Sequence, residues 1–415
     1  MKAEISRKII HIAMGLFALS LPFWVLSRAT VVIMGVIATA VLLALRHVKQ
    51  LRNGIGKAMF GVERKSYGEL YFAFSVVVIF MLHQSTYEYL IPILVLTFAD
   101  SVAALIGTSY GRLNMAQKQE DAKSFEGSVM FYIVAFTCAL VPLQLMTEIG
   151  RAEVLVISFL IGLLAAMIEA VSANGNDNLL LPLLTYSFVR ENAYLSLDTL
   201  FINFGIMLFF LLVILVVYKL KNISKLSIAY SMLVGYIVMI QGGLEWILPP
   251  LILILSYGIL PLMKSEEKQM KLSYKVIECN TIIGMTCLWI AVFFPQYREI
   301  LYLAFSFSFA CHLAINTYSR FVNFVGTKRV TAIICGLLKG IVFIGLPTAL
   351  IARPDRMIVA LYLIFLAAAM LPAVALNDKY DYKTVNDKSI RANKILVGVL
   401  TAVFAILGGA FLWYT

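Results

Sequence analysis

The stretch FALSLPFWVLSRATVVIMG, residues 17–35, runs from one apolar segment into the next with only Ser27 and Arg28 between them. Of the 415 residues, 61% are hydrophobic and 14% are charged. Apolar runs of this kind recur to the end of the chain, most of them long enough to cross a hydrocarbon core of roughly 30 Å as a helix. This composition excludes a soluble globular domain. We therefore predict an all-α, polytopic integral membrane protein.

Polar breaks divide the chain into segments that predict about 15 transmembrane helices in two halves. Those of the first half lie near 9–27, 29–45, 70–83, 87–107, 127–146, 152–172, 178–190 and 199–218. Those of the second half lie near 226–243, 247–262, 276–294, 300–318, 330–350, 357–376 and 395–414. No cleavable leader is expected, because the first apolar segment continues directly into the second.

The basic residues predict which loops face the cytoplasm. If the N-terminus is cytoplasmic and every segment crosses, the loops on the outer side contain Arg28, Arg151, Arg190, Arg298, Arg353 and Arg356. Lys339 lies inside a span, and the other 27 of the 34 lysines and arginines fall on the inner side. Such a bias is typical of cytoplasmic loops. The segment at 178–190 is short, but omitting it would invert every later loop and remove the bias. The sequence therefore predicts a multi-pass protein of the cell (inner) membrane.

Net charge and cysteine content exclude two other classes of protein. The formal net charge of +11 is the excess expected of cytoplasmic loops that face anionic lipid, and we expect no nucleic-acid partner. The five cysteines lie in apolar stretches without paired spacing, so we expect neither disulfides nor cysteine metal ligands.

Unusual polar residues gather at the predicted cytoplasmic ends of the first-half helices. Three of them are acids, Asp100, Glu169 and Asp177. A carboxylate at membrane depth is unfavourable and usually faces a cavity or a partner. Each acid alone could instead be a helix cap or a solvated loop residue. Together they predict a Mg²⁺ site, because Mg²⁺ takes oxygen ligands and commonly bridges substrate phosphates.

Glycines, hydroxyls and a cation near these acids predict phosphate binding. Gly107 and Gly111 in GTSYGR precede KSFEGS, which contains Lys123, Ser124 and Gly127. Backbone amides, a hydroxyl and an ammonium at a helix N-terminus can hold anionic oxygens. No GxxxxGK[ST] loop is present in the sequence, which excludes a Walker-type site.

The first half, roughly residues 1–218, resembles the CTP-dependent polyprenol and phytol kinases, which include dolichol kinase and are related to phosphatidate cytidylyltransferases. The matching motifs, in family order, are RKIIH with Gly15 (7–15), ERKSYGE (63–69), DSVAALIGTSYGR (100–112), KSFEGS (123–128) and EAVSANGNDNLLLP (169–182). The terminal signature of true phosphatidate cytidylyltransferases is absent from the sequence.

The resemblance implies transfer of the γ-phosphoryl group of CTP to the hydroxyl of a lipid alcohol, such as phytol, geranylgeraniol or a polyprenol, at the cytoplasmic membrane face. It implies that the catalytic residues are Asp100, Lys123, Glu126 and Asp177. It implies that the nucleotide is bound by Arg7, Lys8, Gly107, Gly111, Ser124, Gly127 and Ser128. It implies that the lipid substrate is bound by His11, Arg64, Lys65 and Asn178. Mg²⁺ would be held by Asp100, Glu169 and Asp177, and which of the two aspartates is the base stays open.

The second half, in a predicted division of 1–220 and 221–415, is an accessory or degenerate domain. It resembles the phytyl-phosphate kinase family more weakly, and the acid of that family's A-D-T motif is missing at Ile315, Asn316 and Thr317. The segment LNDKYDYKTVNDKS (376–389) is similar to a prenyltransferase diphosphate motif but is more typical of a solvated loop. Lys339 could meet a phosphate or extend to the inner surface.

Two alternative functions remain open from the sequence. A transporter or flippase would place its principal polar groups near the membrane midplane, whereas these groups lie at inner helix ends. A cytidylyltransferase would release pyrophosphate, whereas a kinase would leave the γ-phosphate on the lipid.

Overall fold

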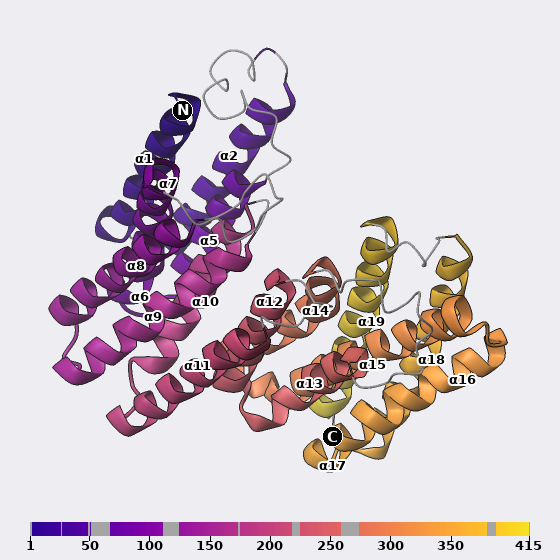
Figure 1. Ribbon diagram of the computed structural model, residues 1–415. Helices are drawn as coiled ribbons and strands as arrows, with labels where there is room; N and C mark the ends of the chain where they lie inside the picture. Colours follow the sequence, from indigo (N-terminus) through magenta and orange to yellow (C-terminus); the bar gives the residue numbers. More distant parts are fainter. Residues whose placement is uncertain are drawn as a thin grey trace. The chain divides into compact units, whose positions relative to one another are not determined.

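The computed structural model describes residues 2–25, 27–48, 50, 67–110, 124–172, 175–217, 225–258, 274–379 and 387–414. Within these residues the chain is helical and divides into two compact units, Met1–Met207 (unit 1) and Leu208–Thr415 (unit 2). The boundary falls inside helix α11 (Figure 1). That the first unit is catalytic and the second accessory stays a prediction.

Unit 1 begins with two helices, α1 and α2, which contain residues 17–24 and 28–35 of the opening apolar stretch. The helices of this part of the chain are α1 (Lys2–Trp24), α2 (Arg28–His47), α5 (Gly68–Leu82), α6 (Thr86–Leu94), α7 (Asp100–Tyr110), α8 (Phe125–Met146), α9 (Arg151–Val171), α10 (Asp177–Asn192) and α11 (Leu197–Val217). A π-helical turn, η1 (Val95–Ala99), joins α6 to α7, so that Thr86–Tyr110 is one apolar helix.

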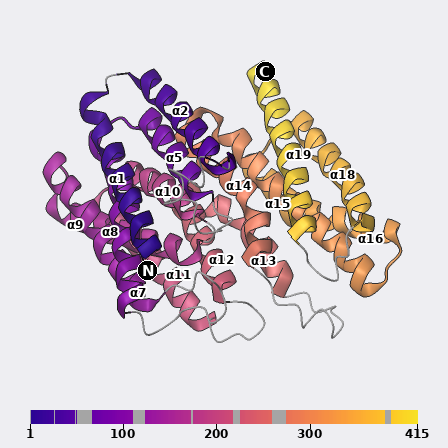
Figure 2. The same cartoon turned by 90° about the horizontal axis from the view of Figure 1, so that it is seen from above.

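Unit 2 is built around one enclosed helix, α15. Its elements are α12 (Lys225–Ile237), η2 (Val238–Gly242), α13 (Leu244–Gly258), α14 (Tyr274–Phe293), η4 (Pro295–Tyr297), α15 (Arg298–Arg320), η5 (Phe321–Val325), α16 (Arg329–Lys339), η6 (Gly340–Gly345), α17 (Leu346–Ala352), α18 (Arg356–Lys379) and α19 (Asp387–Tyr414). Helices α13, α14, α16, α18 and α19 all contact α15 (Figure 2). Phe307 of α15 stacks on Phe404 of α19 at 5.0 Å between ring centroids.

These helices confirm the predicted all-α membrane fold. Each predicted segment overlaps a helix, and nine helices of the described residues are long and apolar enough to cross a bilayer. Helix α10 is not among those nine, because it has only 16 residues. Several of its side chains are polar and buried, among them Thr185, Ser187 and Asn192. It packs against α5, α6 and α9, so protein rather than lipid surrounds much of it.

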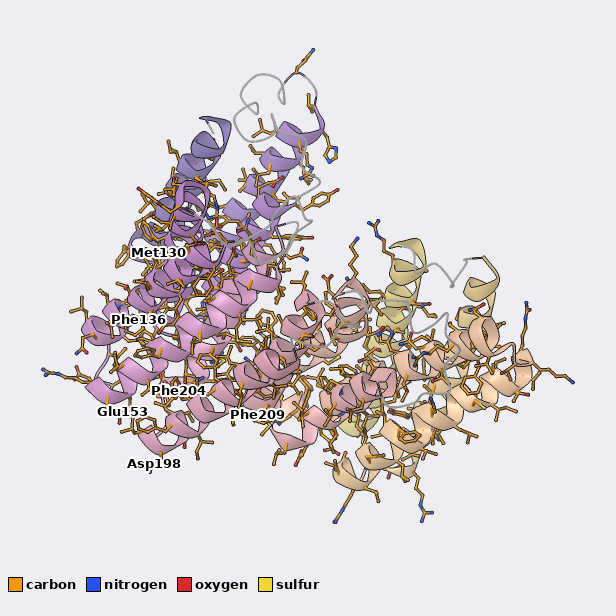
Figure 3. The ribbon with its side chains drawn as sticks, in the orientation of Figure 1. Met130, Phe136, Glu153, Asp198, Phe204 and Phe209 are labelled. Carbon is orange, nitrogen blue, oxygen red and sulfur yellow. The ribbon has the colours of Figure 1, made fainter. Side chains whose placement is uncertain are left out.

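Small residues let the helices of unit 1 approach closely. Ala135 and Ala139 of α8 are fully buried, and a Cβ at Gly162 of α9 would lie 2.9 Å from the ring of Tyr132. Close helix contacts in membranes depend on such residues. Figure 3 shows Met130 and Phe136 along α8, with Glu153 where α9 begins. Because α8 and α9 form a hairpin, the end of α9 returns to the level at which α8 starts.

Candidate active site

Three acids from separate helices meet in unit 1. Asp100 is the first residue of α7, Glu169 lies in the last turn of α9, and Asp177 is the first residue of α10. One carboxylate oxygen from each lies within 4.8 Å of the others, and Glu169 is buried. The structure therefore brings together all three acids that the sequence predicts as metal ligands.

Local structure explains how Asp177 reaches this position. Gly175 has a φ of +82°, a left-handed conformation that favours glycine, and turns the chain from α9 into α10. The Asn178 side chain then donates to the Gly68 carbonyl at 3.0 Å, while the Ser75 hydroxyl donates to the Asn178 carbonyl at 2.8 Å. These two hydrogen bonds hold the start of α10 against α5. Asn178 has this structural role, and its predicted contact with the lipid substrate stays a prediction.

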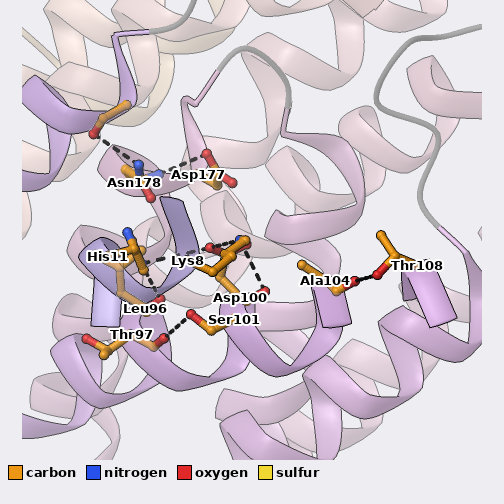
Figure 4. Close-up of polar contacts among 11 residues, drawn as sticks. Lys8, His11, Leu96, Thr97, Asp100, Ser101, Ala104, Thr108, Asp177 and Asn178 are labelled. Atoms are coloured by element: carbon orange, nitrogen blue, oxygen red, sulfur yellow. Dashed lines mark hydrogen bonds and ion pairs between the residues drawn. The ribbon is translucent and has the colours of Figure 1, made fainter. Parts of the chain in front are cut away.

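Lys8 and His11 of α1 stand beside Asp100 (Figure 4). The Lys8 ammonium lies 2.6 Å from Asp100 Oδ2, and Lys8 is only 7% exposed. His11 Nε2 is 3.2 Å from the Leu96 carbonyl and 3.8 Å from Asp100 Oδ2, and its ring meets Phe72 edge to face at 5.5 Å. Both residues therefore contact the acid cluster from one helix.

A glycine sets how closely α1 approaches this cluster. A Cβ at Gly15 would lie 2.2 Å from Thr97 Oγ1, and Thr97 is buried and bonded to the Ile93 carbonyl. Thr97 lies in η1, directly before Asp100. Such π-helical turns are rare and frequently occur at functional sites. The contact fixes α1 against the turn that presents Asp100.

We expect Gly15→Val to displace α1 and to separate Lys8 from Asp100. Overpacking of this kind destabilises by roughly 1–3 kcal/mol, and we expect the activity of the folded protein to fall about tenfold or more because the site is misaligned. Thermal unfolding and initial rates measure the two effects. Gly205→Val is the matched control, because a Cβ at Gly205 of α11 would meet nothing within 4 Å. Equal behaviour of the two variants would contradict the positioning role of Gly15.

The predicted phosphate-binding residues on α7 and α8 have packing roles in the structure. Gly107 lies within α7, and a Cβ at Gly127 of α8 would lie 3.4 Å from the Gly107 Cα. Ser124 caps α8, since its hydroxyl oxygen accepts the Gly127 amide at 3.1 Å. Gly107 thus lies within a helix, and its predicted contact with the nucleotide stays a prediction. Glu126 and Ser128 lie in the first turn of α8, and their predicted roles and those of Ser124 and Gly127 stay predictions.

Other predicted residues lie outside the described part of the chain. These are Arg64, Lys65, Gly111 and Lys123, and the side chain of Arg7. The side chains of the segment at 376–389 also lie outside the described part of the chain.

Sequence reasoning missed the residues that support the site from α2 and α5. Arg46 forms an ion pair with Glu69 at 2.7 Å, and its guanidinium lies 4.0 Å from the centre of the Tyr67 ring. Ser75, which anchors Asn178, was also missed. Glu69 lies within the ERKSYGE motif, which could have indicated its role. Ser75 lies in an apolar run, where no sequence pattern indicates one.

The donor set fits a divalent cation. Three carboxylates lie together beside Lys8, and they supply the oxygen ligands that Mg²⁺ prefers. Asp177, at the N-terminus of α10, also lies where the helix dipole favours negative charge.

A comparison with curated proteins identifies the family. A phytol kinase from Synechocystis sp. is 32% identical over 204 residues, which cover 47% of this chain and 82% of the relative. This chain belongs to the phytol kinase family. No family model matches the chain, and no solved structure matches it significantly. About half of the chain lies outside its match to the phytol kinase, so that relative does not account for all of it.

Proposed function

We propose that this protein is a kinase that transfers the γ-phosphoryl group of CTP to the hydroxyl of a membrane isoprenoid alcohol such as phytol. The observation that carries the proposal is the convergence of Asp100, Glu169 and Asp177 beside Lys8, in a chain that belongs to the phytol kinase family. The proposed location is the cytoplasmic end of unit 1, where a nucleotide from the cytosol would meet a lipid hydroxyl.

The reaction joins the alcohol oxygen to the γ-phosphorus and breaks the bond from that phosphorus to the β–γ bridging oxygen. The products are a lipid phosphate and CDP. Little covalent chemistry is required of the protein, so positioning and charge neutralisation supply most of the catalysis. Bound Mg²⁺ would neutralise the phosphate oxygens.

The residues of this chain have separate tasks in that reaction. Glu169 and one of the two aspartates would hold the metal ion, while the other aspartate would accept the proton of the alcohol. Lys8, which lies 2.6 Å from Asp100, would orient that carboxylate and face the transferred phosphoryl group. His11 and Phe72, in edge-to-face contact, would border the alcohol.

Helix-end geometry favours an enzyme over a transporter. Glu169 lies two residues before the end of α9, and Asp177 begins α10. A carrier with alternating access would place such groups near the midplane. The products distinguish a kinase from a cytidylyltransferase, because a cytidylyltransferase would release the γ-phosphate in pyrophosphate.

The test is an assay of the purified full-length protein with γ-labelled CTP, ATP, GTP or UTP against phytol, geranylgeraniol, dolichol, undecaprenol and diacylglycerol. We expect label on an isoprenoid alcohol, with CTP the best donor and with dependence on Mg²⁺. Asp177→Asn protein, prepared in the same way, is the control for a contaminating kinase. Label in pyrophosphate would overturn the kinase proposal in favour of a cytidylyltransferase, and no labelled product from any pair would overturn it in favour of a carrier.

A further inference from the structure

A proline in α10 leaves one backbone carbonyl of that helix without its helical donor. Pro182 lies in the second turn of α10. In an α-helix the carbonyl of residue 178 accepts from the amide N–H of residue 182, and proline has no N–H. A carbonyl freed in this way in a membrane protein needs another donor, which a serine of a neighbouring helix can supply. The carbonyl concerned is that of Asn178, directly after Asp177 of the acid cluster.

Ser75 of α5 supplies the missing donor. Its hydroxyl donates to the Asn178 carbonyl at 2.8 Å, and Ser75 is fully buried. The hydroxyl oxygen also lies 2.7 Å from the Tyr71 carbonyl of its own helix. That second carbonyl has the Ser75 amide as its helical donor, whereas the Asn178 carbonyl has lost its helical donor to Pro182. The hydrogen bond between the two helices therefore satisfies a group that α10 by itself leaves unsatisfied.

Ser75 lies on the face of α5 that contacts both sides of the site. Gly68, Phe72 and Ser75 are spaced i, i+4 and i+7, which places them on one face of the helix. The Gly68 carbonyl accepts from the Asn178 side chain at 3.0 Å, and the Phe72 ring meets the ring of His11. One face of α5 thus contacts both α10, which carries an acid of the cluster, and α1, which carries the lysine.

We propose that Ser75 is a positioning residue for the metal site. Its hydroxyl fixes the Asn178 carbonyl, and with it the adjacent Asp177, at the distance from the other two acids that one metal ion requires. This distance matters because Mg²⁺ requires near-ideal octahedral geometry with ligands at about 2 Å. Groups that orient a metal ligand contribute roughly tenfold to a hundredfold to metal affinity. The inference rests on the proposed function, because it takes the acid cluster to hold a divalent cation.

The experiment measures Mn²⁺ binding to the full-length protein in phosphatidylcholine nanodiscs by electron paramagnetic resonance. We expect Ser75→Ala to weaken binding by roughly tenfold, because Asp177 is less well positioned although all three carboxylates remain. Ser158→Ala is the matched control. Ser158 is equally buried in α9, and its hydroxyl donates to the Val154 carbonyl of its own helix at 2.7 Å. Its substitution should leave Mn²⁺ binding unchanged.

A second substitution separates positioning from the hydrogen-bonding needs of one carbonyl. Pro182→Ala returns an amide N–H to α10, so the double variant Ser75→Ala with Pro182→Ala satisfies the Asn178 carbonyl without a bond to Ser75. We expect this variant still to bind Mn²⁺ roughly tenfold more weakly than the unsubstituted protein. It carries the same measurement if Ser75→Ala does not fold. Unchanged affinity in Ser75→Ala, or full recovery of affinity in the double variant, would overturn the inference.

Metal binding and turnover fail separately in this experiment. Unsubstituted protein that binds Mn²⁺ but phosphorylates no lipid alcohol would overturn the kinase proposal alone. Unsubstituted protein that phosphorylates a lipid alcohol without binding Mn²⁺ would overturn the positioning role of Ser75 alone. In active protein, we expect Ser75→Ala to raise the Mg²⁺ concentration for half-maximal rate by roughly tenfold, with a rate at saturating Mg²⁺ within a few-fold of the unsubstituted protein.

Discussion

Replacing Asp100 or Asp177 by asparagine is expected to lower the rate of lipid-alcohol phosphorylation by about three orders of magnitude or more. Asparagine keeps the size and one oxygen of the side chain but removes its negative charge. A cluster with two carboxylates in place of three would bind a divalent cation weakly, and one of the two variants would also lack the base. Initial rates measure the loss, and Mn²⁺ binding followed by electron paramagnetic resonance gives a readout that does not depend on turnover.

Asp198→Asn is the matched control for these variants. Asp198 is exposed in the first turn of α11, and it is labelled in Figure 3. Its substitution removes the same charge from a helix N-terminus outside the acid cluster and should leave the rate nearly unchanged. If Asp100→Asn and Asp177→Asn both kept more than a tenth of the activity, the acid cluster would not be the active site.

Replacing Lys8 by methionine is expected to lower the rate by about two orders of magnitude. Removing one partner of a buried ion pair lowers folding stability by about 3–5 kcal/mol, so the rate is compared for folded protein. Without the ammonium, Asp100 loses the contact that orients it, and the phosphoryl group loses a cation. We also expect the concentration of Mg²⁺ needed for half-maximal rate to fall, because the metal ion no longer competes with Lys8 for the carboxylate.

Two further variants separate the role of Lys8 from general destabilisation. Lys8→Arg keeps the charge and should recover part of the rate. In the double variant Lys8→Met with Asp100→Asn, the losses should be far from additive, because the two side chains form one interaction. Additive losses, or a raised requirement for Mg²⁺ in Lys8→Met, would contradict the proposed contact.

The sequence by itself determined the fold class and the positions of the helices. Length and apolarity are local properties, so each predicted segment overlaps a helix within the described residues. The same local information predicted helix ends for Asp100, Glu169 and Asp177 and led to the expectation that they would meet. In the structure Glu169 and Asp177 lie at helix ends, whereas Asp100 lies within the continuous helix Thr86–Tyr110. Hydropathy was weakest for α10, because a helix enclosed by protein can bury polar side chains that a lipid-facing helix cannot.

Only the tertiary structure decided which side chains share the site and in what roles. Lys8 and Asp100 are 92 residues apart, and Asn178 and Gly68 are 110 apart. Their contacts depend on how closely whole helices approach each other. Glycines such as Gly15 allow the close approach, because they have no side chain in the way. No local pattern records that distance. For the same reason the sequence did not show that Gly107 packs against α8 or that Asn178 holds α10 against α5, and their predicted contacts with the nucleotide and the substrate stay predictions.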